Sequence, residues 1–147
     1  MGVNFQLCID CAEPDVLARF WAEALGYVLE PPPEGHPDWD DYWRSVGVPE
    51  DELGTGADSI VDPDGAGPRV MFLIVPEGKT IKNRVHLDIR ASGGRTVPID
   101  LRRARVNAEA DRLVALGATV VGVLETDGID HYAMAMRDPE GNEFDIN

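Results

Sequence analysis

The sequence predicts an α+β fold in which one small unit, a strand, a helix and then about three strands (βαβββ), occurs twice. Three landmarks recur in the same order along the 147 residues. They are an alternating apolar–polar strand, a helix that ends in Leu-Gly, and an Asp-Pro-acid-Gly turn followed by a strand. The first set lies at 5–10, 25–26 and 62–65, and the second set lies at 85–90, 116–117 and 138–141.

Neither half is large enough to bury its apolar face well alone. We therefore expect a single domain, 1–147, in which a first module (1–78) and a second module (79–147) form a curved mixed β-sheet. The helices are expected on the outer face, and a polar central cleft is expected where the halves meet.

In the first half, alternation places Phe5, Leu7 and Ile9 on one face of a strand at 5–10. Pro14 suits the first position of a helix, and Gly26 suits its left-handed C-cap. An apolar stripe at helical spacing lies between them. Further strands are expected at 27–29, 57–61 and 69–75, and the last is nearly continuously apolar, which predicts a strand covered on both faces.

Segment 31–56 interrupts this half and is interpreted as an insertion, because it opens with three prolines and is then acidic and aromatic. A helical turn or short strand is expected within it, at 40–46. Its aromatic side chains have two interpretations, which are a lid over a site and packing in the core.

In the second half, the strand at 85–90 is expected to bury Val85, Leu87 and Ile89 and to expose a polar face. A helix follows, beginning near Pro98 or, because arginines are unfavourable in a first helical turn, nearer Asn107. It ends at Gly117, and strands are expected at 119–123, 132–136 and 143–146.

The composition excludes some partners and some kinds of site. A net charge of −14 repels phosphate backbones, so nucleic acid is not expected as a partner. No apolar run is long enough to span a membrane, and no signal segment is evident, so the expected location is the cytoplasm. Cys8 lies in a strand pattern, so Cys8 and Cys11 are interpreted as ordinary thiols rather than a redox or zinc motif.

Three segments, FWAEALGY, VPEGKTIKNRVH and DPEGNEFDI, make the chain resemble the vicinal oxygen chelate superfamily, nearly throughout and apart from 31–56. That superfamily includes glyoxalase I, bleomycin resistance proteins and extradiol dioxygenases. The nearest resemblance is to glyoxalase-like domain proteins that carry the VPE-x-K-x-x-K-N-R-x-H pattern. The resemblance implies two βαβββ modules, a small-molecule ligand and a homodimer.

Metal-dependent members of this superfamily place four ligands on the first and last strand of each module. The resemblance carries this role to Gln6, His86 and Asp145, with Glu143 as an alternate on the same strand face. The fourth position falls within the apolar run 70–75, which offers no nitrogen or oxygen side chain. Two interpretations remain open: a divalent metal ion held by three residues, or a hydrogen-bonded polar cluster that lines a pocket without a cofactor.

Basic residues gather just before the second module's first strand, in a chain that is otherwise acidic. The candidate ligand-binding residues are Lys79, Lys82, Asn83, Arg84 and Asp88. The basic ones, Lys79, Lys82 and Arg84, suit an anionic ligand group, or alternatively they form ion pairs with Glu77, Asp88 or the insertion. His86 is the candidate for acid–base catalysis because its ordinary pKa lies near neutrality.

Two functions follow, and whether the protein is an enzyme is left open. The first is a glyoxalase-like protein that binds a small, anionic molecule in the cleft without an intact four-ligand metal site. The alternative is a divalent-metal-dependent lyase, isomerase or dioxygenase that uses Gln6, His86 and Asp145.

Overall fold

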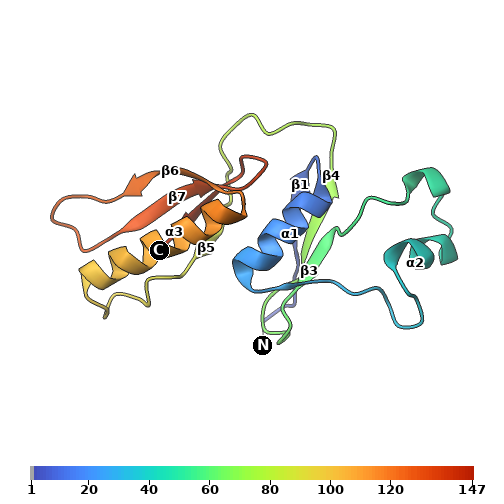
Figure 1. Ribbon diagram of the computed structural model, residues 1–147, viewed down its shortest axis with the longest axis horizontal. Coiled ribbons are helices and arrows are strands. Elements are labelled where there is room, and N and C mark those ends of the chain that lie inside the picture. Colours follow the sequence, from blue (N-terminus) through green and yellow to red (C-terminus); the bar gives the residue numbers. More distant parts are fainter. Residues whose placement is uncertain (1) are drawn as a thin grey trace. The chain divides into compact units, whose positions relative to one another are not determined.

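A computed structural model describes residues 2–147, and the chain divides into two compact units, Met1–Pro76 and Glu77–Asn147 (Figure 1). The long connection in front of Asp88 belongs to the second unit. Within the described residues, no helix is both long and apolar enough to cross a membrane.

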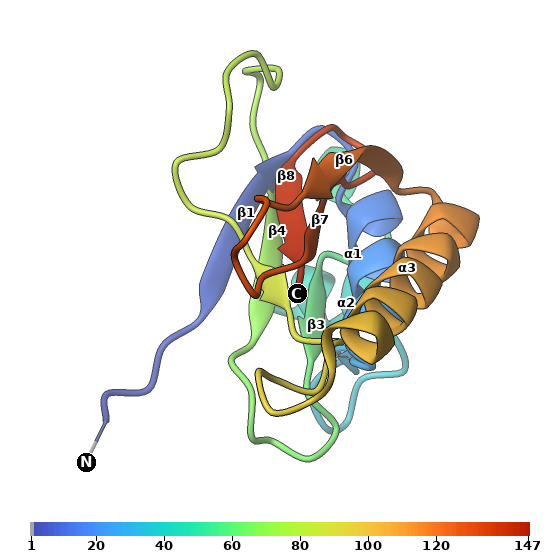
Figure 2. The ribbon, with the colours of Figure 1, turned by 90° about the vertical axis from the view of Figure 1, so that its left-hand side faces the viewer.

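The first unit is a four-stranded mixed sheet with the order β1-β4-β3-β2. Strand β1 (Leu7–Cys11) runs parallel to β4 (Val70–Ile74), as Figure 2 shows, and β4 pairs antiparallel with β3 (Ser59–Val61). Strand β2 (Val28–Leu29) completes the sheet at the far edge of β3. Helix α1 (Pro14–Leu25) packs against β2, β3 and β4, so only one face of this sheet is covered by a helix.

The second unit repeats this topology, with the strand order β5-β8-β7-β6. The first strand again runs parallel to the last, and the remaining neighbours are antiparallel. Helix α3 contacts β6, β7 and β8. The elements are β5 (Asp88–Ile89), α3 (Ile99–Leu116), β6 (Thr119–Leu124), β7 (Ala133–Arg137) and β8 (Glu143–Ile146). The α+β class and the two βαβββ modules are therefore confirmed, and the central cleft stays a prediction.

Each unit has its own apolar core between helix and sheet. In the first unit the core is built on Leu17, Ile60 and Phe72, each no more than 1 % exposed. In the second unit Leu113 and Phe144 take the corresponding places. In β8 and the first part of β4, buried side chains alternate with side chains that are not buried, which leaves a face available for function.

Both long helices end as the sequence predicts, at glycines in the left-handed conformation, with φ of 70° at Gly26 and 116° at Gly117. Of the two expected starts of α3, the one near Pro98 is confirmed and the one near Asn107 was wrong, since the helix begins directly after Pro98. Arginines in the first turns of α3 are stabilised by partners outside the helix. The Arg102 side chain donates to the Val97 carbonyl at 2.9 Å and pairs with Asp130, and it is 6 % exposed.

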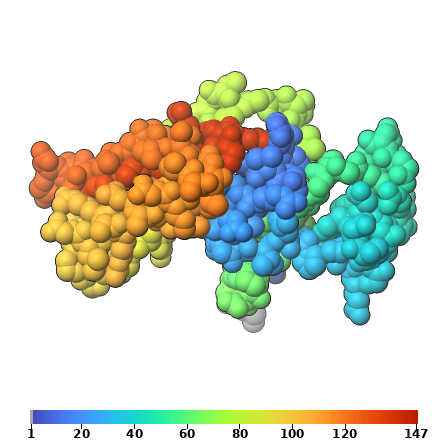
Figure 3. Space-filling model, viewed as in Figure 1, coloured from blue at the N-terminus to red at the C-terminus, as the bar shows by residue number. Residues whose placement is uncertain are grey.

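The insertion forms a short helix, α2 (Trp39–Ser45), and one turn of 3-10 helix, η1 (Glu50–Glu52). Figure 3 shows this segment, in cyan and blue-green, as a protruding part of the first unit's surface. The rings of Trp39, Tyr42 and Trp43 pack on one another with centroids 5.0–5.7 Å apart, and α2 has no buried residue. The aromatic side chains thus do not join the core, and a lid role stays a prediction.

Three strand details differ from the sequence-based expectation. Pairing in β5 is limited to two residues, and Val85 is 79 % exposed, because the preceding chain is drawn into a bend where the Asn83 amide donates to Glu143. Phe5 is 63 % exposed, since β1 begins only at Leu7. The end of β4 is also open, with Leu73 42 % exposed, because α1 covers only one face of the sheet.

Candidate functional site

His86, Asp88 and Asp145 form a cluster on the polar face of the second sheet. Asp88 and Asp145 are register partners across the parallel β5–β8 pair, so their side chains project from the same face. The His86 Nε2 atom lies 3.3 Å from Asp88 Oδ1 and 3.3 Å from Asp145 Oδ2. All three side chains reach solvent, with exposed fractions of 36 %, 46 % and 24 %. The cluster is therefore accessible to a ligand.

The donor set of this cluster fits a divalent metal ion. The imidazole nitrogen and one oxygen from each carboxylate lie within 4.8 Å of one another. Two ligand atoms that each lie ~2.1 Å from an ion are separated by roughly 3.0–3.4 Å in tetrahedral or octahedral geometry. The two 3.3 Å nitrogen–oxygen distances match that spacing. One imidazole with two carboxylates suits manganese, iron(II), nickel or zinc.

Asn147 extends the cluster along the face. Its amide nitrogen donates to Asp88 Oδ2 at 3.1 Å, while Asp88 Oδ1 faces His86. Asp88 thus has one oxygen toward the imidazole and the other toward the C-terminal end of β8. A hydrogen-bonded polar network, the alternative that the sequence left open, is also consistent with these contacts.

Glu143 lies on the same face of β8 as Asp145, as expected, but its carboxylate is engaged elsewhere. It accepts hydrogen bonds from the Asn83 backbone N–H at 3.0 Å and pairs with Lys79 at 2.9 Å. These two contacts, the amide first and the ammonium second, lower the pKa of the Glu143 carboxyl to about 2. Glu143 is consequently ionised at neutral pH and anchors the segment that leads into β5.

The basic candidates do not form a single patch. Lys79 pairs with Glu143 rather than with Glu77 or Asp88. Lys82 and Arg84 are exposed and form no ion pair within residues 2–147. Lys79 and Lys82 border a hollow of about 550 Å³ together with Arg137, and Arg84 is outside it. Their role in ligand binding stays a prediction.

Gln6 belongs to the first unit, just before β1. Its side-chain oxygen accepts from Arg69 Nη1 at 3.1 Å, and Arg69 in turn pairs with Glu30. The proposed partnership of Gln6 with His86 stays a prediction.

The strand register shows which residue of the apolar run 70–75 is equivalent to Asp145. Cys8 lies opposite Met71 in the first unit, as Asp88 lies opposite Asp145 in the second. The fourth ligand position therefore corresponds to the Met71 thioether, which suits soft ions.

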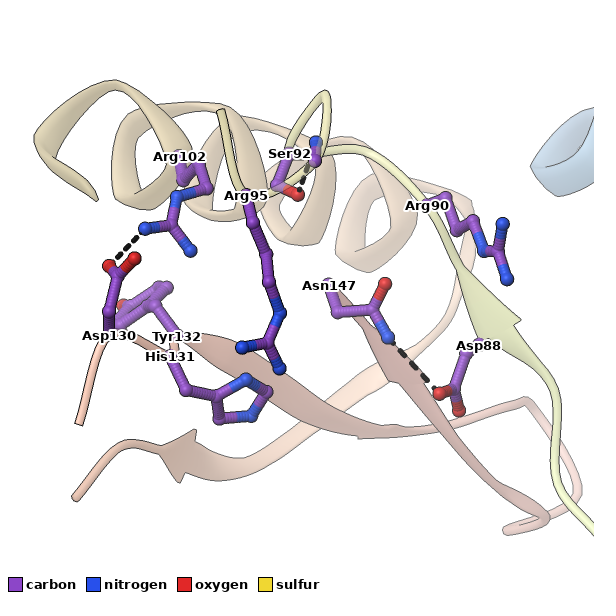
Figure 4. Close-up of a pocket in the computed structure, with 10 residues that line it drawn as sticks. Asp88, Arg90, Ser92, Arg95, Arg102, Asp130, His131, Tyr132 and Asn147 are labelled. Carbon is purple, nitrogen blue, oxygen red and sulfur yellow. Dashed lines mark hydrogen bonds and ion pairs between the residues drawn. The ribbon is translucent and has the colours of Figure 1, made fainter. Parts of the chain in front are cut away.

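A second hollow, of about 560 Å³, adjoins the cluster (Figure 4). Nearly all of its lining side chains are charged or polar, and they include Asp88, Arg90, Arg95, Arg102, Asp130, His131 and Asn147. Of these, only Asp88 was predicted from the sequence as a ligand-binding residue. Arg90 could have been identified because it continues the polar face of the strand with the same parity as His86 and Asp88. Arg95 could not, since it lies in a loop with no periodic pattern.

A family model described as a glyoxalase-like domain matches residues 6–147 of this chain. No curated protein sequence shows significant similarity to this chain. The match covers both units, including the insertion.

Solved structures with the same fold are similar over nearly the full chain. A hypothetical protein from S. aureus is 14% identical with a TM-score of 0.59, over 99% of this chain and 93% of that one. A glyoxalase/bleomycin resistance protein/dioxygenase family enzyme from Burkholderia phytofirmans PsJN is 16% identical with a TM-score of 0.57, over 97% and 94%. A variant of the fosfomycin resistance protein FosX from Listeria monocytogenes, complexed with Mn(II) and 1S,2S-dihydroxypropylphosphonic acid, is 8% identical with a TM-score of 0.59, over 99% and 88%.

Proposed function

Because the chain belongs to the glyoxalase-like domain family, we propose that it binds a small polar molecule on the exposed face of β5 and β8, around His86. The observation that carries this proposal is the convergence of His86, Asp88 and Asp145 at 3.3 Å on a solvent-open face. A sheet face with buried neighbours on its other side holds such side chains in fixed positions, which lowers the entropic cost of binding.

Divalent-metal-dependent catalysis is the second candidate, and the donor spacing of the same cluster favours it. The FosX structure with Mn(II) adds support from a protein of the same fold. A bound ion would act as a Lewis acid on an oxygen of the ligand. Asp88 and Asp145 would share the ion with Nε2 of His86, and Asn147 would fix the position of the Asp88 carboxylate.

The two candidates differ in what His86 does. With an ion, the Nε2 atom of His86 is a ligand and carries no proton. Without an ion, Nε2 can donate a proton to either carboxylate and His86 remains the candidate acid–base group. The expected homodimer is a further proposal, which sedimentation of the purified chain would test.

Metal titration separates these candidates. The full chain is stripped with a chelator and titrated by calorimetry with Mn(II), Ni(II), Zn(II) and Fe(II). The metal-dependent candidate requires one ion per chain and a loss of affinity of about 100-fold or more in His86→Ala. His36→Ala is the matched control, because His36 also pairs with an aspartate, Asp41 at 2.8 Å, but lies in the insertion. If none of these ions binds, the metal-dependent candidate is rejected and metal-free binding remains.

A further inference from the structure

The second hollow is built entirely from the second unit, where several segments end close together. Asp88 and Arg90 come from β5 and its end, and Asn147 follows β8. Arg95 comes from the loop before α3, and His131 from the loop before β7. Its volume of about 560 Å³ lies within the roughly 300–1,000 Å³ typical of small-molecule sites.

Three arginines and two aspartates line this hollow, so its side chains carry a net positive charge in a chain whose net charge is −14. Both side-chain carboxylates in the lining already have partners, because Asp130 pairs with Arg102 and Asp88 faces His86 and Asn147. Arg90 and Arg95 form no ion pair within residues 2–147. Two guanidinium groups are thus free to bind an anion, and guanidinium is the side chain best suited to bidentate carboxylate or phosphate recognition.

The loop that carries Arg95 is held in place rather than loosely solvated. The amides of Ala91 and Ser92 both donate to the Asn147 carbonyl, at 2.7 and 3.0 Å. Arg105 donates to the Ser92 carbonyl at 3.0 Å. In Figure 4 the Arg95 side chain reaches into the hollow, with His131 and Asn147 on either side of its guanidinium in this view. A cation positioned by a fixed loop binds an anion at a lower entropic cost than a mobile surface arginine.

Asp88 connects this hollow with the His86 cluster, since its two oxygens face Asn147 and His86 respectively. We propose that the hollow receives the negatively charged group of the ligand, a carboxylate or a phosphate or phosphonate, through Arg95 and Arg90. The proposal rests on the proposed function for the rest of the ligand, which would extend from the hollow past Asp88 to His86. The ligand class is therefore a small organic anion with a polar group at the opposite end.

Anion binding is tested on the chelator-treated full chain by following backbone amide signals during titrations with inorganic phosphate, methylphosphonate and acetate. We expect saturable shifts at residues 88–95 and 130–132, and the tightest of the three anions identifies the charged group. Arg95→Gln should weaken that binding by at least about tenfold, and Arg90→Gln should weaken it less. Arg112→Gln is the matched control, since it removes an arginine of α3 that pairs with Glu109 and lies outside the hollow.

The proposal is overturned if none of the three anions gives saturable shifts in this region, or if Arg112→Gln weakens binding as much as Arg95→Gln does. The anion titrations use chelator-treated protein, so their outcome does not depend on whether the His86 cluster binds a metal ion, and failure of the hollow is distinct from failure of the metal-dependent candidate. Backbone amide signals outside residues 88–95 and 130–132 that match those of wild type show that Arg95→Gln is folded.

Discussion

The two units share one topology but present different chemistry at equivalent positions. Asp88 lies opposite Asp145 in the second unit, and Cys8 lies opposite Met71 in the first. Two residues earlier along each first strand stand His86 and Gln6. The second unit therefore offers an imidazole and two carboxylates where the first offers an amide, a thiol and a thioether. Only the second set suits a hard or borderline divalent ion.

This difference shows which positions determine the fold and which are free to vary. The alternate residues of each central strand are buried in both units, Val70 and Phe72 in β4 and Phe144 and Ile146 in β8. Those positions maintain the same strand order in both sheets. The intervening positions face away from the helix, so their side chains can change without loss of the core, and they determine what each unit can bind.

The largest expected effect is on the cores, where the two units should behave alike. Phe72 and Phe144 are each 1 % exposed, so either Phe→Ala change should lower the free energy of unfolding by about 3–5 kcal/mol. Urea unfolding measures the loss, and hydrogen exchange should show which strands lose protection. Val28→Ala, at a position that is 46 % exposed, is the control with little effect. A loss at one phenylalanine and none at the other would contradict the equivalence of the cores.

The next effect should be confined to one unit. Changing Asp88→Cys and Asp145→Met gives the second unit the residues of the first, so under the metal-dependent candidate its Mn(II) affinity should fall by about 100-fold or more. Calorimetric titration of the full chain measures this change. Met71→Leu in the first unit is the control and should leave Mn(II) affinity unchanged. Retention of Mn(II) affinity in the double variant would show that these aspartates are not the ligands.

Much of this comparison could be predicted from the sequence, because regular periodicity predicts regular structure. The period-two pattern before Cys11, the apolar stripe of the first helix and the glycine after each long helix were sufficient to predict two βαβββ modules. They were sufficient because buried positions and left-handed caps leave few alternatives for residue type. The segment 143–146 was placed as the final strand with the bounds the structure shows.

The features that could not be predicted from the sequence depend on contacts between residues far apart in the chain. The start of α3 was ambiguous because the partners of Arg102 lie at Val97 and Asp130, which no local propensity can indicate. The β1–β4 register was ambiguous because the run 70–75 is apolar throughout and offers no alternation to fix it. Arg95 was missed because a loop side chain has no period, and only the fold places it in the hollow.

The repeated Asp-Pro-acid-Gly turns give a smaller expected difference. Asp138 is 2 % exposed and accepts the backbone amides of Glu140 and Asn142 at 3.0 and 2.9 Å. Asp138→Ala leaves these amides without their acceptor in a part-buried turn, which should lower the free energy of unfolding by about 1–3 kcal/mol. Asp62 also accepts backbone amides, but it is more exposed, so water can replace it in Asp62→Ala. Thermal unfolding of both variants measures the difference. An equal loss of stability in Asp62→Ala and Asp138→Ala would contradict this prediction.

The smallest expected effect concerns the first turns of the two long helices. Asp15 accepts hydrogen bonds from Arg19 and from the Ala57 amide, at 2.9 Å each, and these contacts lower the pKa of its carboxyl from 3.8. Asp100 in α3 pairs with Arg103 of the same helix, at 3.3 Å, and its side chain is 92 % exposed. Asp15 therefore connects its helix to the segment before β3, whereas the contact of Asp100 stays within its own helix.

This contrast predicts a difference in acid stability. Because the folded pKa of Asp15 lies below the unfolded one, the unfolded chain takes up the proton first as the pH falls. The stabilisation by Asp15 is thus complete above pH 3.8 and is lost as the pH falls below it. Asp15→Asn keeps the shape and an acceptor oxygen but removes the charge, so it should be less stable than wild type at pH 6 and closer to it at pH 3. Urea unfolding at both pH values measures this, and Asp100→Asn should show a much smaller change between them. If the stability difference between Asp15→Asn and wild type were the same at both pH values, the ionised carboxylate would not be what holds Ala57 to the helix.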